Sequence, residues 1–349
     1  MGRSQLGAGP IYLHRMTPDG KTLLDYGKII YTGPVAEGTK FYKRHGYYYL
    51  SIPEGGVGEG WQTILRSKNI YGPYEKKVVL EQGNTTVNGP HQGALVDTPE
   101  GEWWFFHFQL TEPLGRVVHL QPVCWMENWP VIGVDMDMNG IGEPVKVWTK
   151  PGVSKSVLVS HPQTTDDFNS YTLGLQWKFN HNPVNTHWSL NERRGWLALK
   201  ALKAATLRES RNMLTQKCMG YLSTATVLLD FSALADGQRG GLFCTGSLYN
   251  GIGISREEGK NYLYLEKNGD VQQVKMVSGK KIYLRVMLDA KKNRCQLFYS
   301  FDNCNFILCG DAYSLKFGDW KGARVGLYSY NTLGIGGKCY FDWFNYDFN

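Results

Sequence analysis

Three ionisable side chains lie just where strand-like alternating runs begin. Glu37 lies between an alanine and a glycine, His91 follows a Gly-Pro pair, and Arg116 follows a glycine. A cavity that desolvates a glutamate raises its pKa and keeps a proton available for general-acid catalysis. An arginine presents a fixed fork of N–H donors to hydroxyl or carboxylate groups. Residue type alone also fits structural roles: a loop glutamate, a hydrogen-bonded turn histidine and a salt-bridged arginine.

Aromatic residues and glycine are abundant among the 349 residues, with 41 Gly, 21 Tyr, 15 Phe and 11 Trp. Glycine marks turns and aromatic side chains fit pleated surfaces, so this composition predicts an all-β fold. Aromatic faces also stack on sugar rings, which makes Trp61 a candidate platform and Gln62 a candidate partner for hydroxyls. A core position suits Trp61 equally well. Weaker candidates, for which a structural role fits better or no worse, are Glu54, Asp97, Glu112, His107, His119, Trp188 and Tyr249.

Charge and targeting signals exclude several classes of protein. The net charge of +7 is mild and its 38 basic and 31 acidic residues are scattered, which argues against nucleic-acid binding. We find no apolar run of membrane-spanning length. Residues 1–9 have no apolar signal-peptide core, so the chain as written is expected to be cytoplasmic, or secreted or periplasmic if an N-terminal segment was lost. Seven cysteines without a CxxC pair signal neither a zinc site nor a disulfide framework.

The strands predicted to hold these residues fall into two groups, one in each half of the chain. In the first half, strand-like runs at 41–43, 47–52 and 62–67 are followed by a comparable set at 93–97, 103–109 and 117–122. This spacing is typical of four-stranded propeller blades. After a linker around 148–163, short strands recur, and Asn268-Gly269 is a strong hairpin signal. The second half is therefore predicted to be a two-sheet sandwich, with domains at 1–155 and 156–349. The later strands are expected at 196–199, 223–229, 261–265, 282–288, 295–300 and 324–329.

Several ordered motifs resemble glycoside hydrolase family 43 over essentially the whole chain. They are VAEGTK at 35–40 leading into YKRHGYYY at 42–49, NGPHQG at 88–93 with VDTP and EWW after it, and GRVVHLQPV at 115–123 with NWPVIG at 128–133. FNHNP at 179–183 resembles the start of that family's C-terminal sandwich, and FDWF at 341–344 its last strand. The resemblance implies a five-bladed β-propeller, here partial and short at its N-terminus, followed by a concanavalin-like β-sandwich.

The resemblance also implies a function. The family includes inverting α-L-arabinofuranosidases and β-xylosidases that act on arabinose- or xylose-containing plant oligosaccharides and polysaccharides. Glu37 matches the general acid, Arg116 the arginine that reaches the substrate pocket, and His91 the central histidine that helps to hold a water or ion. No cofactor is expected to be required, although a structural Ca²⁺ at His91 would be coordinated largely through water, because calcium prefers oxygen ligands.

One part of the family pattern is not matched. The family's base is an aspartate near the start of the first blade, and the 34 residues before Val35 contain only Asp19 and Asp25, neither in such a motif. An inverting reaction needs both carboxyl groups. Open blade edges favour pairing, so we expect a homo-oligomer, whose partner copy could supply the base. The sequence therefore predicts a glycosidase whose activity is weak or depends on oligomer assembly. The alternative is a catalytically impaired carbohydrate-binding protein.

Overall fold

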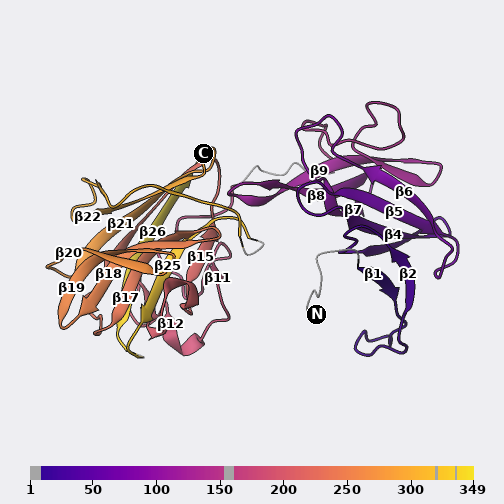
Figure 1. Cartoon of the computed structure of the whole chain (residues 1–349). Helices are drawn as coiled ribbons and strands as arrows, with labels where there is room; N and C mark the ends of the chain where they lie inside the picture. The colour runs from indigo at the N-terminus through magenta and orange to yellow at the C-terminus, as the bar shows by residue number, and fades with distance from the viewer. Residues whose placement is uncertain (1–8, 153–160, 319–320, 335) are drawn as a thin grey trace. The chain divides into compact units, whose positions relative to one another are not determined.

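The computed structural model describes residues 9–152, 161–318, 321–334 and 336–349. The chain divides into two compact units (Figure 1), one of residues 1–111 with 116–158 and one of residues 112–115 with 159–349. The predicted boundary between residues 155 and 156 lies outside the described residues. No helix in the described part of the chain is long and apolar enough to cross a membrane.

The first unit contains two four-stranded antiparallel sheets and a two-stranded hairpin, and in each larger sheet the strands pair in chain order. This is the meander of a propeller blade. The sequence had predicted the first three strands of each blade but not the fourth, β6 or β10. The strands are β1 (Pro10–Leu13) and β2 (Lys28–Thr32); β3 (Lys40–Arg44), β4 (Tyr47–Glu54), β5 (Trp61–Ser67) and β6 (Glu75–Leu80); β7 (His91–Asp97), β8 (Trp103–Thr111), β9 (Gly115–Met126) and β10 (Trp129–Ile132).

The core of the first unit lies between the two blades. Tyr49 and Ile64 from one sheet pack with Leu95 and Phe105 from the other, and all four are at most 5% exposed. Side chains alternate along a strand, so the residues that follow Leu95 and Phe105 point to the opposite face of the second blade. Phe106 on that face is 45% exposed. The homo-oligomer expected from open blade edges stays a prediction.

The second unit is built from two sheets that stack as a sandwich, and their strands pair antiparallel except for β14, which runs parallel to β25. One has the strand order β11-β15-β25-β17-β18-β19-β20, with β14 beside β25, and the other β12-β13-β26-β16-β21-β22-β23, with β24 beside β22. The bounds in the first sheet are β11 (Lys178–Phe179), β14 (Leu202–Lys203), β15 (Leu214–Lys217), β17 (Gln238–Thr245), β18 (Tyr249–Glu257), β19 (Lys260–Lys267), β20 (Asp270–Met276) and β25 (Arg324–Asn331). Those in the second are β12 (Trp188–Ser189), β13 (Leu197–Lys200), β16 (Leu222–Asp230), β21 (Lys281–Asp289), β22 (Arg294–Ser300), β23 (Ile307–Leu308), β24 (Tyr313–Ser314) and β26 (Lys338–Phe348).

Two short 3₁₀ turns complete this unit, η1 (Asn185–His187) and η2 (Leu207–Glu209). The six strands predicted for the second half are all present, and the Asn268-Gly269 turn joins β19 to β20 as expected. Both turn residues have positive φ, 51° and 97°. That is the requirement of the type I′ hairpin turn, which asparagine and glycine meet most easily.

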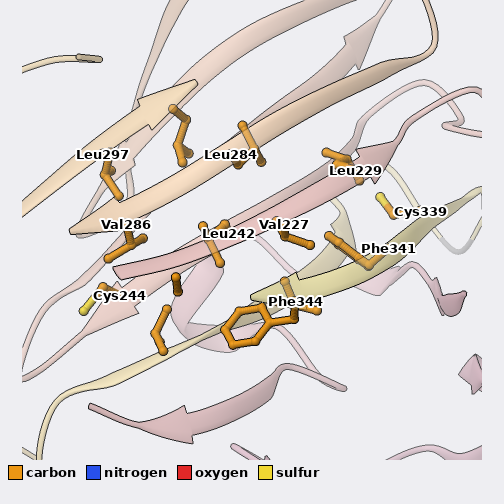
Figure 2. Close-up of a cluster of buried hydrophobic side chains, with 14 of the residues drawn as sticks. Val227, Leu229, Leu242, Cys244, Leu284, Val286, Leu297, Cys339, Phe341 and Phe344 are labelled. Atoms are coloured by element: carbon orange, nitrogen blue, oxygen red, sulfur yellow. The ribbon is translucent and has the colours of Figure 1, made fainter. Parts of the chain in front are cut away.

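The sandwich core is a single large apolar cluster. Figure 2 shows Leu242 and Cys244 of one sheet among Val227, Leu284 and Phe341 of the other. Each of these five residues is 0% exposed. All seven cysteines of the chain are free thiols, as the sequence predicted; five are buried, whereas Cys124 and Cys304 are exposed.

Strands β17 and β18 are rich in glycine, and the sequence did not predict them. Gly241 pairs with Gly253 between the two strands, and the Tyr328 side chain of β25 lies over this pair. A Cβ at position 253 would lie 2.2 Å from the Gly240 carbonyl oxygen and 2.8 Å from the Tyr328 hydroxyl. Glycine is therefore required here by the close approach of backbone and a tyrosine, as is common inside strands.

This close approach predicts that Gly253→Ala lowers the free energy of unfolding by about 1–3 kcal/mol, because overpacking forces backbone shifts. Urea unfolding followed by tyrosine and tryptophan fluorescence would measure it. Gly334→Ala is the matched control, since nothing lies within 4 Å of its Cβ position. Its change should stay within about 0.5 kcal/mol. Equal stability of Gly253→Ala and the parent chain would contradict the packing described for β17 and β18.

Candidate active site

Glu37, His91 and Arg116 all belong to the first unit, and their predicted roles in a common pocket stay predictions. Glu37 lies in the segment that leads into β3, and its backbone N–H donates to the Pro53 carbonyl oxygen at 3.2 Å. His91 is the first residue of β7 and Arg116 the second of β9. The charge of Glu37 acts to raise the pKa of His91 and that of Arg116 to lower it, so both groups lie within electrostatic range of the His91 imidazole.

His91 is a neutral histidine with one unused nitrogen. It is 1% exposed, and burial is the main cause that lowers its pKa below the usual value. Nδ1 lies 2.8 Å from the Gly89 carbonyl oxygen. A carbonyl can only accept, so Nδ1 carries the proton and Nε2 is left with a lone pair. Nε2 is buried and has no hydrogen-bond partner among the described residues. The site therefore offers an acceptor to a water or a substrate hydroxyl.

Arg116 reaches the same place through an aromatic contact. Its guanidinium carbon lies 4.7 Å from the centre of the Phe108 ring, a cation–π distance. Phe108 pairs with His91 across β7 and β8, and the two rings are 5.6 Å apart. Phe108 thus contacts both the guanidinium and the imidazole. This arrangement fixes the direction of an always-charged donor at the site.

Trp61 and Gln62 are held by protein partners. Gln62 is 0% exposed; its Nε2 donates to Ser51 Oγ at 2.9 Å and its Oε1 accepts from the Gln92 N–H at 3.1 Å. Gln62 therefore positions the start of β7 next to His91. Trp61 is half-buried, and its indole N–H donates to Glu54 at 3.3 Å. The substrate-binding roles predicted for both residues stay predictions.

The sequence ranked Glu54 as a weak candidate, but it is a major element of the site's framework. Its carboxylate is 0% exposed and accepts hydrogen bonds from Tyr31 at 2.7 Å, from Trp61 and, through a very short bond, from Thr63. Lys76 Nζ forms an ion pair with it at 3.2 Å. The carboxylate is therefore fully committed to protein donors.

Two further contacts connect Glu54 with the Glu37 segment. A Cβ at Gly33 would lie 1.9 Å from Glu54 Oε1, so this position must lack a side chain. The Gly55 N–H donates to the Pro34 carbonyl oxygen at 3.0 Å. The four residues after Gly33 lead to Glu37, and the position of Glu37 therefore depends on Glu54 staying in place.

The other candidates have different surroundings. Asp97 is exposed at the far end of β7, as expected for a turn residue. Glu112 belongs to the second unit, where its carboxylate accepts the Phe317 N–H at 2.5 Å. In the sandwich, Tyr249 is 5% exposed and packs against Phe243, whereas the Trp188 ring packs against Phe179.

His107 is a core histidine, as the sequence predicted. It is 3% exposed, and burial lowers its pKa to about 4. Its Nδ1 donates to the Phe108 carbonyl oxygen at 3.1 Å, and its Nε2 accepts from the Gln121 amide at 3.2 Å. The His119 ring stacks on it at 5.3 Å, and burial also lowers the pKa of His119.

Few side chains near His91 could bind a metal ion directly. The described residues contain no group of three or more His, Cys, Asp and Glu side chains able to hold a metal ion. The unpartnered Nε2 of His91 fits a bound water better than a calcium ion, which prefers oxygen. The residues present thus fit only a water-mediated ion, and the Ca²⁺ stays a prediction.

Comparisons with known proteins agree with the motifs. The model described as "Glycosyl hydrolases family 43" matches residues 2–130, and that described as "Beta xylosidase C-terminal Concanavalin A-like domain" matches residues 165–347. A provisionally named beta-xylosidase from Xylanibacter ruminicola is 55% identical over 93% of this chain and 61% of its own length. A non-reducing end alpha-L-arabinofuranosidase from Bacteroides ovatus is 30% identical over 77% of this chain and 51% of its own length.

A solved structure supports the same fold. The GH43 protein BlXynB from Bacillus licheniformis matches 97% of this chain and 70% of its own with a TM-score of 0.83 and 26% identity. The all-β class, with a propeller followed by a concanavalin-like sandwich, is thereby confirmed. The chain spans about three fifths or less of the length of the two curated relatives.

The Glu54 contacts predict a large stability effect. Glu54→Gln should lower the free energy of unfolding by about 3–5 kcal/mol, because it leaves buried donors and the Lys76 charge without their anionic partner. Chemical denaturation at neutral pH would measure the change. Glu75→Gln is the control: this carboxylate is 66% exposed and pairs with Arg66, so its loss should cost less than about 1 kcal/mol. Similar losses in both variants would refute the special role of Glu54.

His107 predicts a pH dependence. Its folded-state pKa of about 4 lies below the unfolded value near 6.5, so the unfolded chain binds the proton first as the pH falls. The contribution of neutral His107 to the free energy of unfolding is fully present above about pH 6.5. It declines as the pH falls toward about 4, by about 1.4 kcal/mol per pH unit at most. In His107→Gln this part of the decline should vanish. Unfolding curves of both proteins at pH 7.5 and 4.5 test this, and parallel declines would contradict it.

Proposed function

We propose, from the premise that the chain belongs to glycoside hydrolase family 43, that it cleaves xylose- or arabinose-containing oligosaccharides or polysaccharides of plant origin. The names of its relatives, a beta-xylosidase and an alpha-L-arabinofuranosidase, support this substrate class. The observation that supports the proposal is a buried imidazole, His91, that lies within electrostatic range of the Glu37 carboxylate and the Arg116 guanidinium.

In the proposed mechanism Glu37 is the general acid. It delivers its proton to the departing glycosidic oxygen as the bond to the anomeric carbon breaks and positive charge develops on the sugar ring. Arg116 donates hydrogen bonds to hydroxyls of the bound sugar. His91 accepts one through its unused Nε2. These two contacts orient the ring so that the scissile oxygen faces the carboxyl group.

An inverting reaction also needs a base about 6.5–9.5 Å from the acid, with room for a water between them. Three carboxylates near this part of the chain are already engaged. Asp25 accepts from the Arg15 and Gly27 N–H groups, Asp19 accepts from Thr17 in a turn, and Glu54 is surrounded by donors. A carboxylate from a region of the relatives that this chain does not span, or from a second copy of the chain, would complete the pair.

The second candidate function is carbohydrate binding without turnover. The engagement of Asp19, Asp25 and Glu54 by other groups favours it, because a pocket that lacks a second carboxylate to act as base can hold a sugar without activating a water. Incubation with an oligosaccharide distinguishes the two functions, because an enzyme cleaves the oligosaccharide whereas a binding protein leaves it intact.

Glu37→Gln tests the acid role. With xylobiose as substrate, kcat/KM should fall about 10²- to 10⁴-fold, the usual range for a lost general acid. With 4-nitrophenyl β-D-xyloside or α-L-arabinofuranoside the loss should be much smaller, because nitrophenolate leaves with little help from a proton. Glu100→Gln, an exposed turn glutamate, serves as the control and should match the parent chain.

Equal losses on both kinds of substrate would mean that Glu37 is not the acid. Absence of turnover in the parent chain, together with saturable binding of xylobiose by calorimetry, would instead favour the binding function.

A further inference from the structure

A second groove lies in the first unit, at the opposite strand ends from Glu37 and His91. Its volume is about 390 Å³, within the roughly 300–1,000 Å³ of small-molecule sites. Strand β7 begins at His91 and ends at Asp97, which pairs with Trp103 in the groove wall. At about 3.3 Å per residue, the length of β7 separates the two places by about 20 Å. The groove residues used below are Arg44, Glu102, Trp103, Trp104, Trp125 and Trp148.

Two indole rings and a guanidinium form the wall of this groove. The Trp103 and Trp125 ring centres are 5.3 Å apart with their planes at 79°, so the rings meet edge to face. The Arg44 guanidinium carbon lies 4.0 Å from the Trp125 ring centre and 5.5 Å from that of Trp103. This contact holds a cation with planar N–H donors beside an aromatic corner.

Glu102 supplies an acceptor in the same groove. Its Oε2 accepts from the Trp104 indole N–H at 3.4 Å and from the Gly152 N–H at 2.8 Å. These two bonds fix the carboxylate while the residue as a whole stays exposed. The groove therefore combines a held anion with a held cation, and their opposite charges favour a neutral ligand rich in hydroxyls over a phosphate or a polyanion.

Two features of the groove are not explained by packing. Trp148 is 52% exposed although its side chain is among the largest apolar groups in the chain. The Nε1–H of Trp125 is buried and has no acceptor among the described residues. An exposed indole face and an unused indole donor are groups that a sugar ring can engage, through its C–H face and its hydroxyl oxygens respectively.

We propose that this groove is a second saccharide-binding site, separate from the site at Glu37, that holds a segment of a neutral xylan chain. The stacking surface comes from Trp148 and the aromatic corner, and Arg44 and Glu102 exchange hydrogen bonds with the hydroxyls. The choice of xylan among neutral polysaccharides rests on the proposed function. The site retains polymer on the protein and leaves hydrolysis of small substrates unaffected.

Binding of insoluble xylan and of xylohexaose tests the proposal, with Glu37→Gln as the parent so that no substrate is consumed. Adding Trp148→Ala should weaken retention on xylan and raise the Kd for xylohexaose by about fivefold, the size expected for one lost aromatic contact. Tyr26→Ala is the matched control, because this aromatic side chain is 100% exposed on the β1–β2 hairpin and outside the groove. It should bind as the parent does.

Unchanged xylan retention in the Trp148→Ala variant would overturn the proposal, as would an equal loss in Tyr26→Ala. Stronger retention on polygalacturonate than on xylan would overturn the neutral ligand class. In the otherwise unmodified chain, Trp148→Ala should leave the rate on 4-nitrophenyl β-D-xyloside unchanged. If no nitrophenyl glycoside is hydrolysed while xylan is still retained through Trp148, the proposed catalytic function fails and the second site stands.

Discussion

The buried carboxylate of Glu54 is the interaction on which the candidate site depends. Its donors come from three strands: Tyr31 from β2, Trp61 and Thr63 from β5, and Lys76 from β6. A buried charge is tolerated only when it is paired and hydrogen-bonded, so these strands must stay together for the charge to stay satisfied. The same cluster stabilises the charged form of Lys76. Burial acts to lower the pKa of this side chain, but hydrogen bonding to Tyr31 and the charge of Glu54 raise it overall. The loop to Glu37 is built against this cluster.

The sandwich also contains a buried carboxylate that is surrounded by hydrogen-bond donors. Glu266 is 0% exposed and accepts from the Leu207 N–H at 2.6 Å and from the Tyr330 hydroxyl at 2.5 Å. Desolvation raises the pKa of the neighbouring Tyr330, and the charge of Glu266 and its hydrogen bond to Tyr330 raise it further. This carboxylate holds the η2 segment over a tyrosine-rich sheet face whose glycines make room for the rings. Here the buried acid fixes the η2 segment through the Leu207 N–H.

Two histidines of the first unit, His91 and His107, show that burial by itself does not determine the role of a histidine. His91 and His107 both have lowered pKa values because both are buried. His107 uses its two nitrogens on Phe108 and Gln121, so nothing remains for a ligand. His91 uses one on Gly89 and keeps Nε2 unpartnered. His91 therefore differs from His107 in keeping one ring nitrogen without a hydrogen-bond partner among the described residues.

The sequence by itself determined the all-β class and the order of the two parts, and its motifs selected Glu37, His91 and Arg116 as candidates, because turn chemistry, alternation and short motifs are local properties of the chain. It did not reveal the structural importance of Glu54. The partners of this carboxylate are distant in the chain: Tyr31 lies 23 residues before it and Lys76 lies 22 residues after it. Strands β17 and β18 escaped prediction for a related reason: their glycines are explained by neighbours distant in the chain, Tyr328 over Gly251 and Gly253 and Cys339 beside Gly240. The groove of Arg44, Trp103, Trp125 and Trp148 also arises only when separate strand ends meet. Burial, hydrogen-bond saturation and grooves are properties of neighbours in space, and only the tertiary structure decides which residues those are.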